Sequence, residues 1–159
     1  MLERQTRSPR SGLLMIALVS AALALLAFAP MAPAQSIISG TGCGGLAIGY
    51  AGTGSLGTHY DISVSGGPPN ALAAMLLGAP SPSVDLTIIG MTGCNMMLTA
   101  PGSAPVVLDA SGFYSVGFNI ISDPAIIGTV LGTQYAAIAI GVNPLGVALS
   151  DRLTLVIQA

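Results

Sequence analysis

His59 is the only histidine of the chain, and it stands two residues before Asp61. Side chains two residues apart on a β-strand point to the same face, so a strand here would bring an imidazole beside a carboxylate. With a serine nucleophile, this pair could carry out acyl transfer, the chemistry of a Ser-His-Asp triad. The serines close to it in sequence are Ser55, Ser63 and Ser65.

The residues around Ser55 argue against that use. Thr53-Gly54-Ser55-Leu56-Gly57 has threonine where the nucleophile elbow of hydrolases has its first glycine. From residue 35 onward the chain has no lysine and no glutamate, so an acid–base mechanism would have to run through His59 and an aspartate. A histidine beside an aspartate is more often a cross-strand or turn partner. We therefore predict that the protein is not an enzyme and has no catalytic residue.

Cys43 and Cys94 are the only cysteines, and each directly follows a glycine. An even cysteine count in an exported chain favours a disulfide, and the flexible glycine settings allow the backbone to meet its geometry. Closing a loop of about 50 residues stabilises by about 4 kcal/mol in the chain-entropy model. A soft copper site from Met91, Cys94, Met96 and His59 is the rival interpretation, but its spacing is not specific. We predict the Cys43–Cys94 disulfide.

Two further motifs suggest cofactors. Gly52-Thr53-Gly54-Ser55-Leu56-Gly57 matches the dinucleotide-binding glycine pattern, which works only where a strand feeds a helix. Here a strand pattern follows, so we interpret the match as false. Loop aspartates could hold calcium, but they form no acidic run and are better explained as turn formers (Asp109, Asp123 and Asp151). We predict no cofactor and no metal site.

The N-terminal residues are typical of an export signal. Three arginines precede an apolar run of 16 residues, 13–28, which is shorter than the about 20 residues of a membrane-spanning helix. Ala32-Pro33-Ala34 places small residues before a cleavage site between Ala34 and Gln35, and Ala27-Phe28-Ala29 fits less well because Pro30 would follow the cut. We predict a cleaved signal helix over 1–34 and one secreted domain over 35–159, in the periplasm or outside the cell.

The composition of residues 35–159 excludes several partners. This part has five aspartates and one arginine, Arg152, for a net side-chain charge of −5 + 1 = −4. A nucleic-acid or anionic-membrane surface requires several cations, so neither is an expected partner. The scarcity of charge indicates a neutral extracellular domain, or a surface that packs against copies of itself or a larger assembly.

Carbohydrate binding is the natural alternative for an exported β-domain. Sugar platforms rely on exposed aromatic rings, and this chain has few of them, about half of which the strand alternation would bury. The aromatic residues of 35–159 are Tyr50, Tyr60, Phe113, Tyr114, Phe118 and Tyr135.

The elements that must position these residues are strands. Apolar and polar residues alternate with a period of two in four segments, and less regular strands fit five more. The regular segments are 60–65, 84–89, 114–120 and 153–158; the others are 46–50, 72–77, 96–100, 106–108 and 129–140. Turn signals separate them at 66–70, 78–82, 101–102 and 143–146, and 109–112 is typical of a tight hairpin. We predict an all-β fold, an antiparallel β-sandwich of jelly-roll or immunoglobulin-like type with about eight or nine strands and no capped helix, or a compact barrel.

Several different short motifs are spread over nearly the whole of residues 35–159. They are Gly-Thr-Gly-Cys at 40–43, Leu77-Gly78, Asp85-Leu86 with 90–94, Asp109 with Gly112, Gly128-Thr129 with Gln134, and Asn143 with Gly146 and Ser150. In these motifs the chain resembles small β-rich domains, without an assigned activity, of secreted and surface proteins of environmental bacteria. The resemblance implies an extracellular sandwich with a Cys43–Cys94 bridge, and no catalytic residues.

Together these observations predict a secreted structural or interaction domain of the cell envelope or extracellular matrix. Its expected partners are copies of itself or other envelope or matrix proteins. The alternative prediction is an extracellular module that binds a ligand or a glycan.

Overall fold

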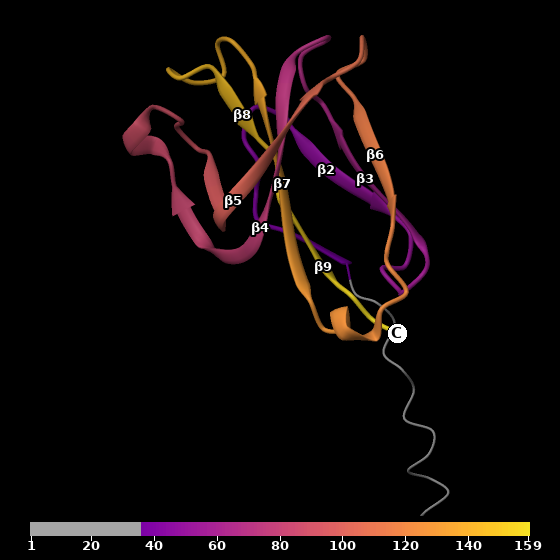
Figure 1. Cartoon of the computed structure of the whole chain (residues 1–159). Helices are drawn as coiled ribbons and strands as arrows, with labels where there is room; N and C mark the ends of the chain where they lie inside the picture. Colours follow the sequence, from indigo (N-terminus) through magenta and orange to yellow (C-terminus); the bar gives the residue numbers. More distant parts are fainter. Residues whose placement is uncertain (1–35) are drawn as a thin grey trace, which may run out of the picture. The chain divides into compact units, whose positions relative to one another are not determined.

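A computed structural model describes residues 36–159, which form nine strands and two one-turn 3-10 helices (Figure 1). The strands are β1 (Ser36–Ser39), β2 (Ala47–Ala51), β3 (His59–Ser65), β4 (Leu72–Asp85), β5 (Asn95–Val107), β6 (Tyr114–Asn119), β7 (Val130–Ile138), β8 (Val147–Leu149) and β9 (Arg152–Val156). The 3-10 helices are η1 (Thr87–Ile89) and η2 (Pro124–Ile126). The predicted signal peptide and its Ala34–Gln35 cleavage site lie outside the described residues.

The strands form two antiparallel sheets. The larger sheet has the order β1-β9-β7-β4-β5, with β8 also paired to β7, and the smaller one has the order β2-β3-β6. Buried residues of both sheets form one core, which includes Tyr60 and Ile62 of the small sheet and Tyr135, Leu153 and Leu155 of the large one. This arrangement confirms the predicted all-β, antiparallel class and fits a sandwich.

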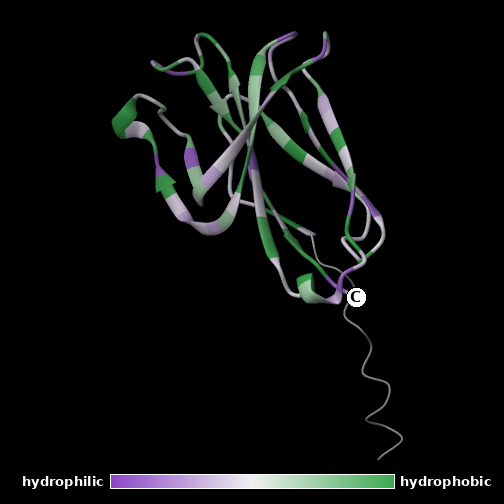
Figure 2. Cartoon of the chain, in the orientation of Figure 1, coloured by the Kyte–Doolittle hydropathy of each residue, from purple (hydrophilic) through white to green (hydrophobic). Residues whose placement is uncertain are grey.

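Strand alternation decides which side chains enter the core. Tyr60, Ile62 and Val64 of β3 are at most 1% exposed, while the residues between them reach solvent, so the predicted strand at 60–65 is confirmed. Figure 2 shows the same change between apolar and polar residues along several strands. The short strands β1 and β8 were not predicted, because four and three residues are too few to show a period.

The turns predicted at 78–82 and 101–102 are wrong. Both segments lie inside one long ribbon, because β4 has 14 residues, β5 has 13, and the two pair along most of their length with register shifts after Leu77 and Pro80. Proline lacks the amide hydrogen that a ladder needs, but these prolines lie where no third strand pairs. Pairing of β4 with β7 stops at Gly78, and β5 pairs with β4 alone.

The strand predicted over 84–89 is also wrong beyond Asp85. The Asp85 carboxylate accepts hydrogen bonds from the backbone N–H and the hydroxyl of Thr87, at 2.8 and 2.6 Å, and the chain enters η1 instead. Ile88 is therefore 92% exposed rather than buried. The second 3-10 helix, η2, is capped by Asp123, whose carboxylate accepts from the Ala125 N–H. Only η2 has a side-chain cap, and both elements are single 3-10 turns of three residues.

The turn predicted at 109–112 is confirmed, but it does not form a hairpin. The Asp109 carboxylate accepts from the N–H groups of Ser111 and Phe113, and Gly112 takes the left-handed backbone conformation with φ of 75°. The flanking strands β5 and β6 belong to different sheets. The turn therefore carries the chain from the large sheet to the small one.

The far half of the β4–β5 ribbon folds back over the outer face of the large sheet. Gln134 of β7 is fully buried there, and its side chain accepts from the Met97 N–H at 2.7 Å. The same amide donates to the carbonyl oxygens of Ser150, at 2.9 Å, and Asn95, at 3.2 Å. One side chain thus joins the ribbon to the central strand and to the junction between β8 and β9.

We predict that Gln134→Leu lowers the free energy of unfolding by about 3 kcal/mol, because the Met97 N–H and the Ser150 carbonyl lose their buried partner. Urea unfolding of the two proteins measures the difference. Gln158→Leu is the matched control, since no side-chain hydrogen bond of Gln158 occurs among the described residues, and a change well below 1 kcal/mol is expected there. Equal losses in both variants would contradict the assigned role.

Candidate functional site

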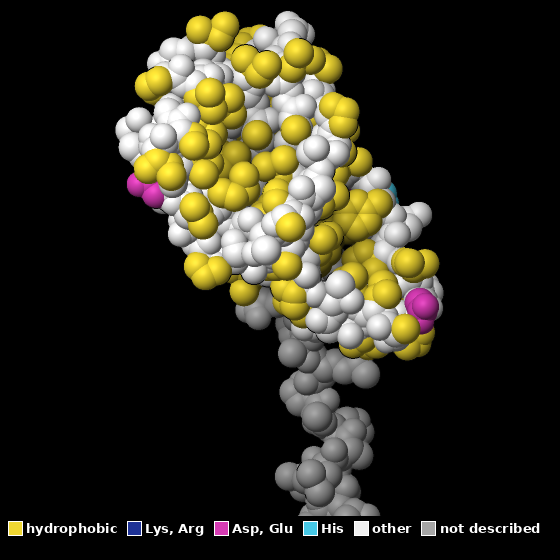
Figure 3. All heavy atoms as spheres, turned by 60° about the vertical axis from the view of Figure 1, so that its left-hand side comes forward, with side chains coloured by type: hydrophobic (Ala, Val, Ile, Leu, Met, Phe, Trp, Pro, Cys, Tyr) yellow, Lys and Arg dark blue, Asp and Glu magenta, His cyan; other side chains and the backbone are white. Residues whose placement is uncertain are grey.

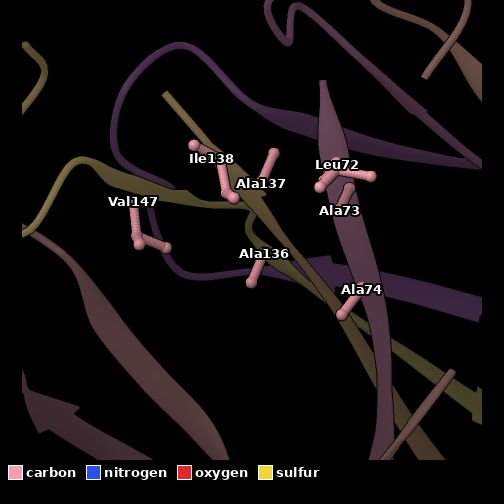
Figure 4. A pocket seen from close by; sticks show the side chains of 7 residues that line it. All are labelled: Leu72, Ala73, Ala74, Ala136, Ala137, Ile138 and Val147. Atoms are coloured by element: carbon pink, nitrogen blue, oxygen red, sulfur yellow. The ribbon is translucent and has the colours of Figure 1, made fainter. Parts of the chain in front are cut away.

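An apolar hollow lies on the outer face of the large sheet. Its volume is about 300 Å³, and its lining comes from β4, β7 and β8: Leu72, Ala73, Ala74, Ala136, Ala137, Ile138 and Val147 (Figure 4). On the face that Figure 3 turns to the viewer, hydrophobic side chains predominate and carboxylates stand at the margins. We call the depression lined by these seven residues the apolar hollow.

Small side chains on two paired strands create the depression. Ala74 pairs with Ala136 in the β4–β7 ladder, and both methyl groups leave space that larger residues around them do not fill. Leu72 and Ile138 stand on the rim with 61% and 50% of their surface exposed. No lining residue has a polar side chain, so the hollow can bind apolar surface but can neither orient a polar ligand by side-chain hydrogen bonds nor assist a reaction.

A second, smaller core borders the hollow. Met91, Cys94 and Leu149 are buried together, and Ala136 and Val147 of the hollow pack against them. The predicted Cys43–Cys94 disulfide is present, with its Cα atoms 5.0 Å apart, and is confirmed. Disulfides are typical of oxidising, extracellular-type compartments.

Hydrogen bonds fix the bridge to β8. The Cys43 N–H donates to the Leu149 carbonyl at 2.7 Å. Asn143 donates to the Val147 carbonyl at 2.6 Å and accepts from the Val147 N–H at 3.2 Å. Asn143 lies in a predicted turn and in one of the motifs that carry the resemblance, but the backbone groups that its amide binds become visible only in the fold. The bridge and Asn143 together hold the wall of the hollow.

The predicted neighbours His59 and Asp61 are in contact on the outer face of the small sheet. The His59 Nε2 atom lies 3.3 Å from the Asp61 carboxylate, and His59 Nδ1 lies 2.9 Å from the side-chain oxygen of Asn119. The hydrogen bond to Asn119 and then the charge of Asp61 raise the pKa of His59 above its ordinary value of 6.5. Both ring nitrogens are thus engaged by other residues, and no hydrogen bond joins His59 to Ser55, Ser63 or Ser65 among the described residues.

The residues of the rival copper interpretation are not brought together. Cys94 belongs to the disulfide and lies with Met91 in the second core, whereas His59 lies on the small sheet. The glycine pattern at 52–57 joins β2 to β3, so a strand follows it, as predicted. Within residues 36–159, no group of three or more His, Cys, Asp or Glu side chains could hold a metal ion.

The tyrosines turn largely inward. Tyr60 and Tyr135 are fully buried, and burial raises the pKa of Tyr135 to about 12. Tyr50 stacks on Tyr60 with ring centroids 5.9 Å apart, and Tyr114 meets Tyr135 edge-on at 6.4 Å. The prediction that alternation buries about half of the aromatic residues is consistent with these positions, and no aromatic ring lines the apolar hollow.

The only cation of the described residues serves the fold. Arg152 donates from its guanidinium to the carbonyls of Ser81 and Met97, at 2.7 and 3.3 Å, and to the hydroxyl of Ser39 at 3.0 Å. These partners lie on β4, β5 and β1, so one side chain connects three strands across the outer face of β9. The charge of Arg152 is therefore engaged internally rather than offered to an anionic ligand.

We predict that reduction of the Cys43–Cys94 bridge lowers the free energy of unfolding by about 4 kcal/mol. Denaturant unfolding with and without a reductant measures this. A Cys43→Ala/Cys94→Ala double variant should already have the lower stability and should not respond to the reductant. Two free thiols in the intact mass of the exported protein would refute the bridge.

We predict that the pKa of His59 lies above 6.5 in the folded chain and that Asn119→Ala and Asp61→Asn each lower it. Because the folded pKa is raised, the protonated imidazole contributes stability below the unfolded pKa, and this contribution disappears as the pH rises through the folded value. NMR titration of the ring protons measures each pKa, with the urea-unfolded chain as the reference. A folded pKa at or below that reference would contradict the geometry.

Comparisons with protein-family models, curated proteins and solved structures found no match to this chain. Within residues 36–159, no helix is long and apolar enough to cross a membrane.

Proposed function

We propose that this chain is an exported, non-catalytic structural or interaction domain of the cell envelope or extracellular matrix. One observation carries the proposal: an apolar hollow and many large apolar side chains face solvent on a domain with almost no charge. The most exposed are Ile140, Ile88, Ile121, Leu72, Val107 and Val84. Contiguous apolar surface is typical of interaction sites, and the lining of the apolar hollow is such a surface.

Low charge supports association. Five aspartates and Arg152 are the only side chains with a full charge in residues 36–159, apart from His59 when it is protonated. Long-range repulsion between copies is therefore weak, and a partner would not have to desolvate many ionic groups. Association by apolar and small polar surfaces fits this composition.

The outer face of the small sheet adds a second exposed surface. Small residues share it with the His59–Asp61–Asn119 group: Gly49 of β2 pairs with Ser63 of β3, which pairs with Ser115 of β6, and Gly117 of β6 pairs with Asp61. Short side chains allow a sheet face to approach another surface closely over a wide area. A face with many short side chains on one sheet and an apolar hollow on the other suit a domain that packs into an assembly.

The His59 geometry supports a non-catalytic role. A general base needs a free ring nitrogen next to its nucleophile, but Asn119 and Asp61 use both nitrogens. The group acts as a cross-strand tie between β3 and β6, which makes Asn119 and Asp61 structural partners of the histidine.

Export is part of the same proposal. The basic and apolar residues of 1–34 and the Cys43–Cys94 bridge both suit a chain that leaves the cytoplasm. We assign the sandwich to the jelly-roll or immunoglobulin-like type, and we group the chain with the small secreted β-rich domains that its motifs resemble.

A second candidate function is ligand binding, and the apolar hollow favours it. Its volume of about 300 Å³ lies at the lower end for ligand pockets. A lining of alanine, leucine, isoleucine and valine would suit an aliphatic group better than a sugar, which needs polar partners and an aromatic face. An aliphatic ligand is therefore the form of this alternative that we retain, ahead of a glycan.

We predict that purified residues 35–159 associate reversibly as the concentration rises, because weakly charged apolar surface is removed from water. Light scattering from the micromolar to the millimolar range measures the mass. A monomer at every concentration would contradict self-association, and ester or peptide hydrolysis lost in His59→Ala would contradict the non-catalytic role.

We predict that Ile138→Asp weakens binding to an octyl-coated surface by about tenfold, because a charge on the rim of the hollow opposes apolar contact. Surface plasmon resonance measures the affinity. Ile127→Asp is the matched control, since Ile127 is 47% exposed, close to the 50% of Ile138, but lies outside the hollow. Equal weakening by both variants would show that the hollow has no special part in apolar binding.

A further inference from the structure

β6 is an edge strand whose outer side is free. It pairs with β3, and no other strand among residues 36–159 pairs with it (Figure 1). Its sequence, Tyr-Ser-Val-Gly-Phe-Asn, contains neither a proline nor a charged residue. Natural proteins usually protect edge strands with such residues, because an unpaired row of N–H and C=O groups can pair with another chain.

The hydrogen-bond pattern identifies the free backbone groups. Just beyond the strand, the Ile120 N–H donates to the Thr58 carbonyl at 2.9 Å, so the even-numbered residues of β6 bond toward β3. In an antiparallel ladder the residues between them direct both backbone groups to the other side. The free edge therefore consists of the N–H and C=O groups of Ser115, Gly117 and Asn119. Their backbone groups make no hydrogen bond outside the sheet among the described residues.

The small sheet is narrower than the sheet it covers. The Tyr114 ring of β6 meets Tyr135 of β7, so β6 lies opposite β7, whereas β4 and β5 extend the large sheet further. Inward-facing Ala73 and Met75 of β4 and Val106 of β5 remain only partly buried. A strand added beside β6 would lie over these residues and bury them more fully.

The other edges are less open. β5 carries Pro101 and Pro105, and β1 has only four residues. The edge at β2 adjoins the large sheet, since the Tyr50 hydroxyl donates to the Ser36 carbonyl of β1 at 3.1 Å. β6 is the one edge of the described sheets that combines length, absence of proline and absence of charge with an incompletely covered core beside it.

We propose that a second copy of this chain pairs with β6 through its own β6, antiparallel about a two-fold axis at Gly117. This inference rests on the proposed self-association and names its site. In this register, Gly117 faces Gly117 of the other copy and Ser115 faces Asn119, so the free groups of one strand meet the free groups of the other. Val116 then lies opposite Phe118 on the inner face, which places apolar residues beside apolar residues.

The strand is self-complementary in this register. Glycine at the axis leaves no side chain between the two strands, and any Cβ at Gly117 would already collide with His59 and Asp61 of its own copy. The side-chain ends of His59 and Asp61 lie over Gly117, so each copy brings one imidazole and one carboxylate to the outer face at the axis, and their charges balance within each copy when His59 is protonated. The two small sheets become one continuous sheet through the dimer.

Amide hydrogen exchange at low and high protein concentration tests the proposal on the native chain, residues 35–159. The amides of Ser115, Gly117 and Asn119 should exchange rapidly in the monomer and slow at least tenfold as the dimer forms. The amides of Val116 and Phe118, which bond to β3, should be protected at both concentrations. Dimerisation without slowing at these three amides would overturn the β6 junction, while leaving self-association through another surface intact.

Ser115→Pro provides an independent test. It removes the outward N–H and, as Ser115→Ala also does, the 3.4 Å hydrogen bond from the Ser115 hydroxyl to the Ile62 carbonyl. The backbone ladder between β3 and β6 is retained, and the dimer dissociation constant measured by light scattering should rise at least tenfold. Ser115→Ala, the matched control, keeps the amide and should dimerise like the native chain. A Ser115→Pro chain with native circular dichroism and undiminished dimerisation would overturn the proposal, whereas a native chain that stays monomeric at every concentration would contradict the proposed self-association itself.

Discussion

The side-chain amide of Gln134 is the interaction on which much of the structure depends. It lies fully buried on the outer side of the central strand β7, and its oxygen accepts from Met97 of β5 while its nitrogen donates to Ser150. A buried amide without these partners would be strongly unfavourable, so the folded-back half of the ribbon and the β8–β9 junction need each other to satisfy it. Arg152 strengthens the same region by donating to Ser81 and Met97.

The surface features follow from this fold-back. Because the ribbon and its 3-10 turn lie against β7 and β8, Met91, Cys94 and Leu149 gain a small core of their own, and the disulfide closes it. Beside that core, the paired alanines of β4 and β7 remain uncovered and form the apolar hollow. Among residues 36–159, the opposite sheet has only three strands, which leaves the β6 edge free and part of the large sheet incompletely buried. The proposed modes of association thus use the apolar hollow and the β6 edge, two places where the fold leaves apolar side chains or backbone groups uncovered.

Much of the fold could be predicted from the amino-acid sequence. The alternation at 60–65 and 153–158 marked strands correctly, since one face of each is buried, and paired cysteines in an otherwise exported-type chain indicated the bridge. The errors have a common cause. Pro80, Pro82 and Pro101 were interpreted as turn residues, yet they lie in strands because no neighbour requires their missing N–H groups. Similarly, the apparent strand at 84–89 ends where Asp85 captures the Thr87 N–H, a local bond that competes with the alternation.

The sequence alone determined the all-β class, the lack of charge, the disulfide and the pairing of His59 with Asp61, because these depend on composition or on residues close together along a strand. Tertiary structure alone decided which strands lie at edges, where the ribbon folds back and that Asn119 engages the second nitrogen of His59. It also decided that the side-chain amides of Asn143 and Gln134 bind backbone groups of Val147 and Ser150. These features join residues far apart in the chain, and their partners are determined by sheet order and register, which local periodicity does not encode.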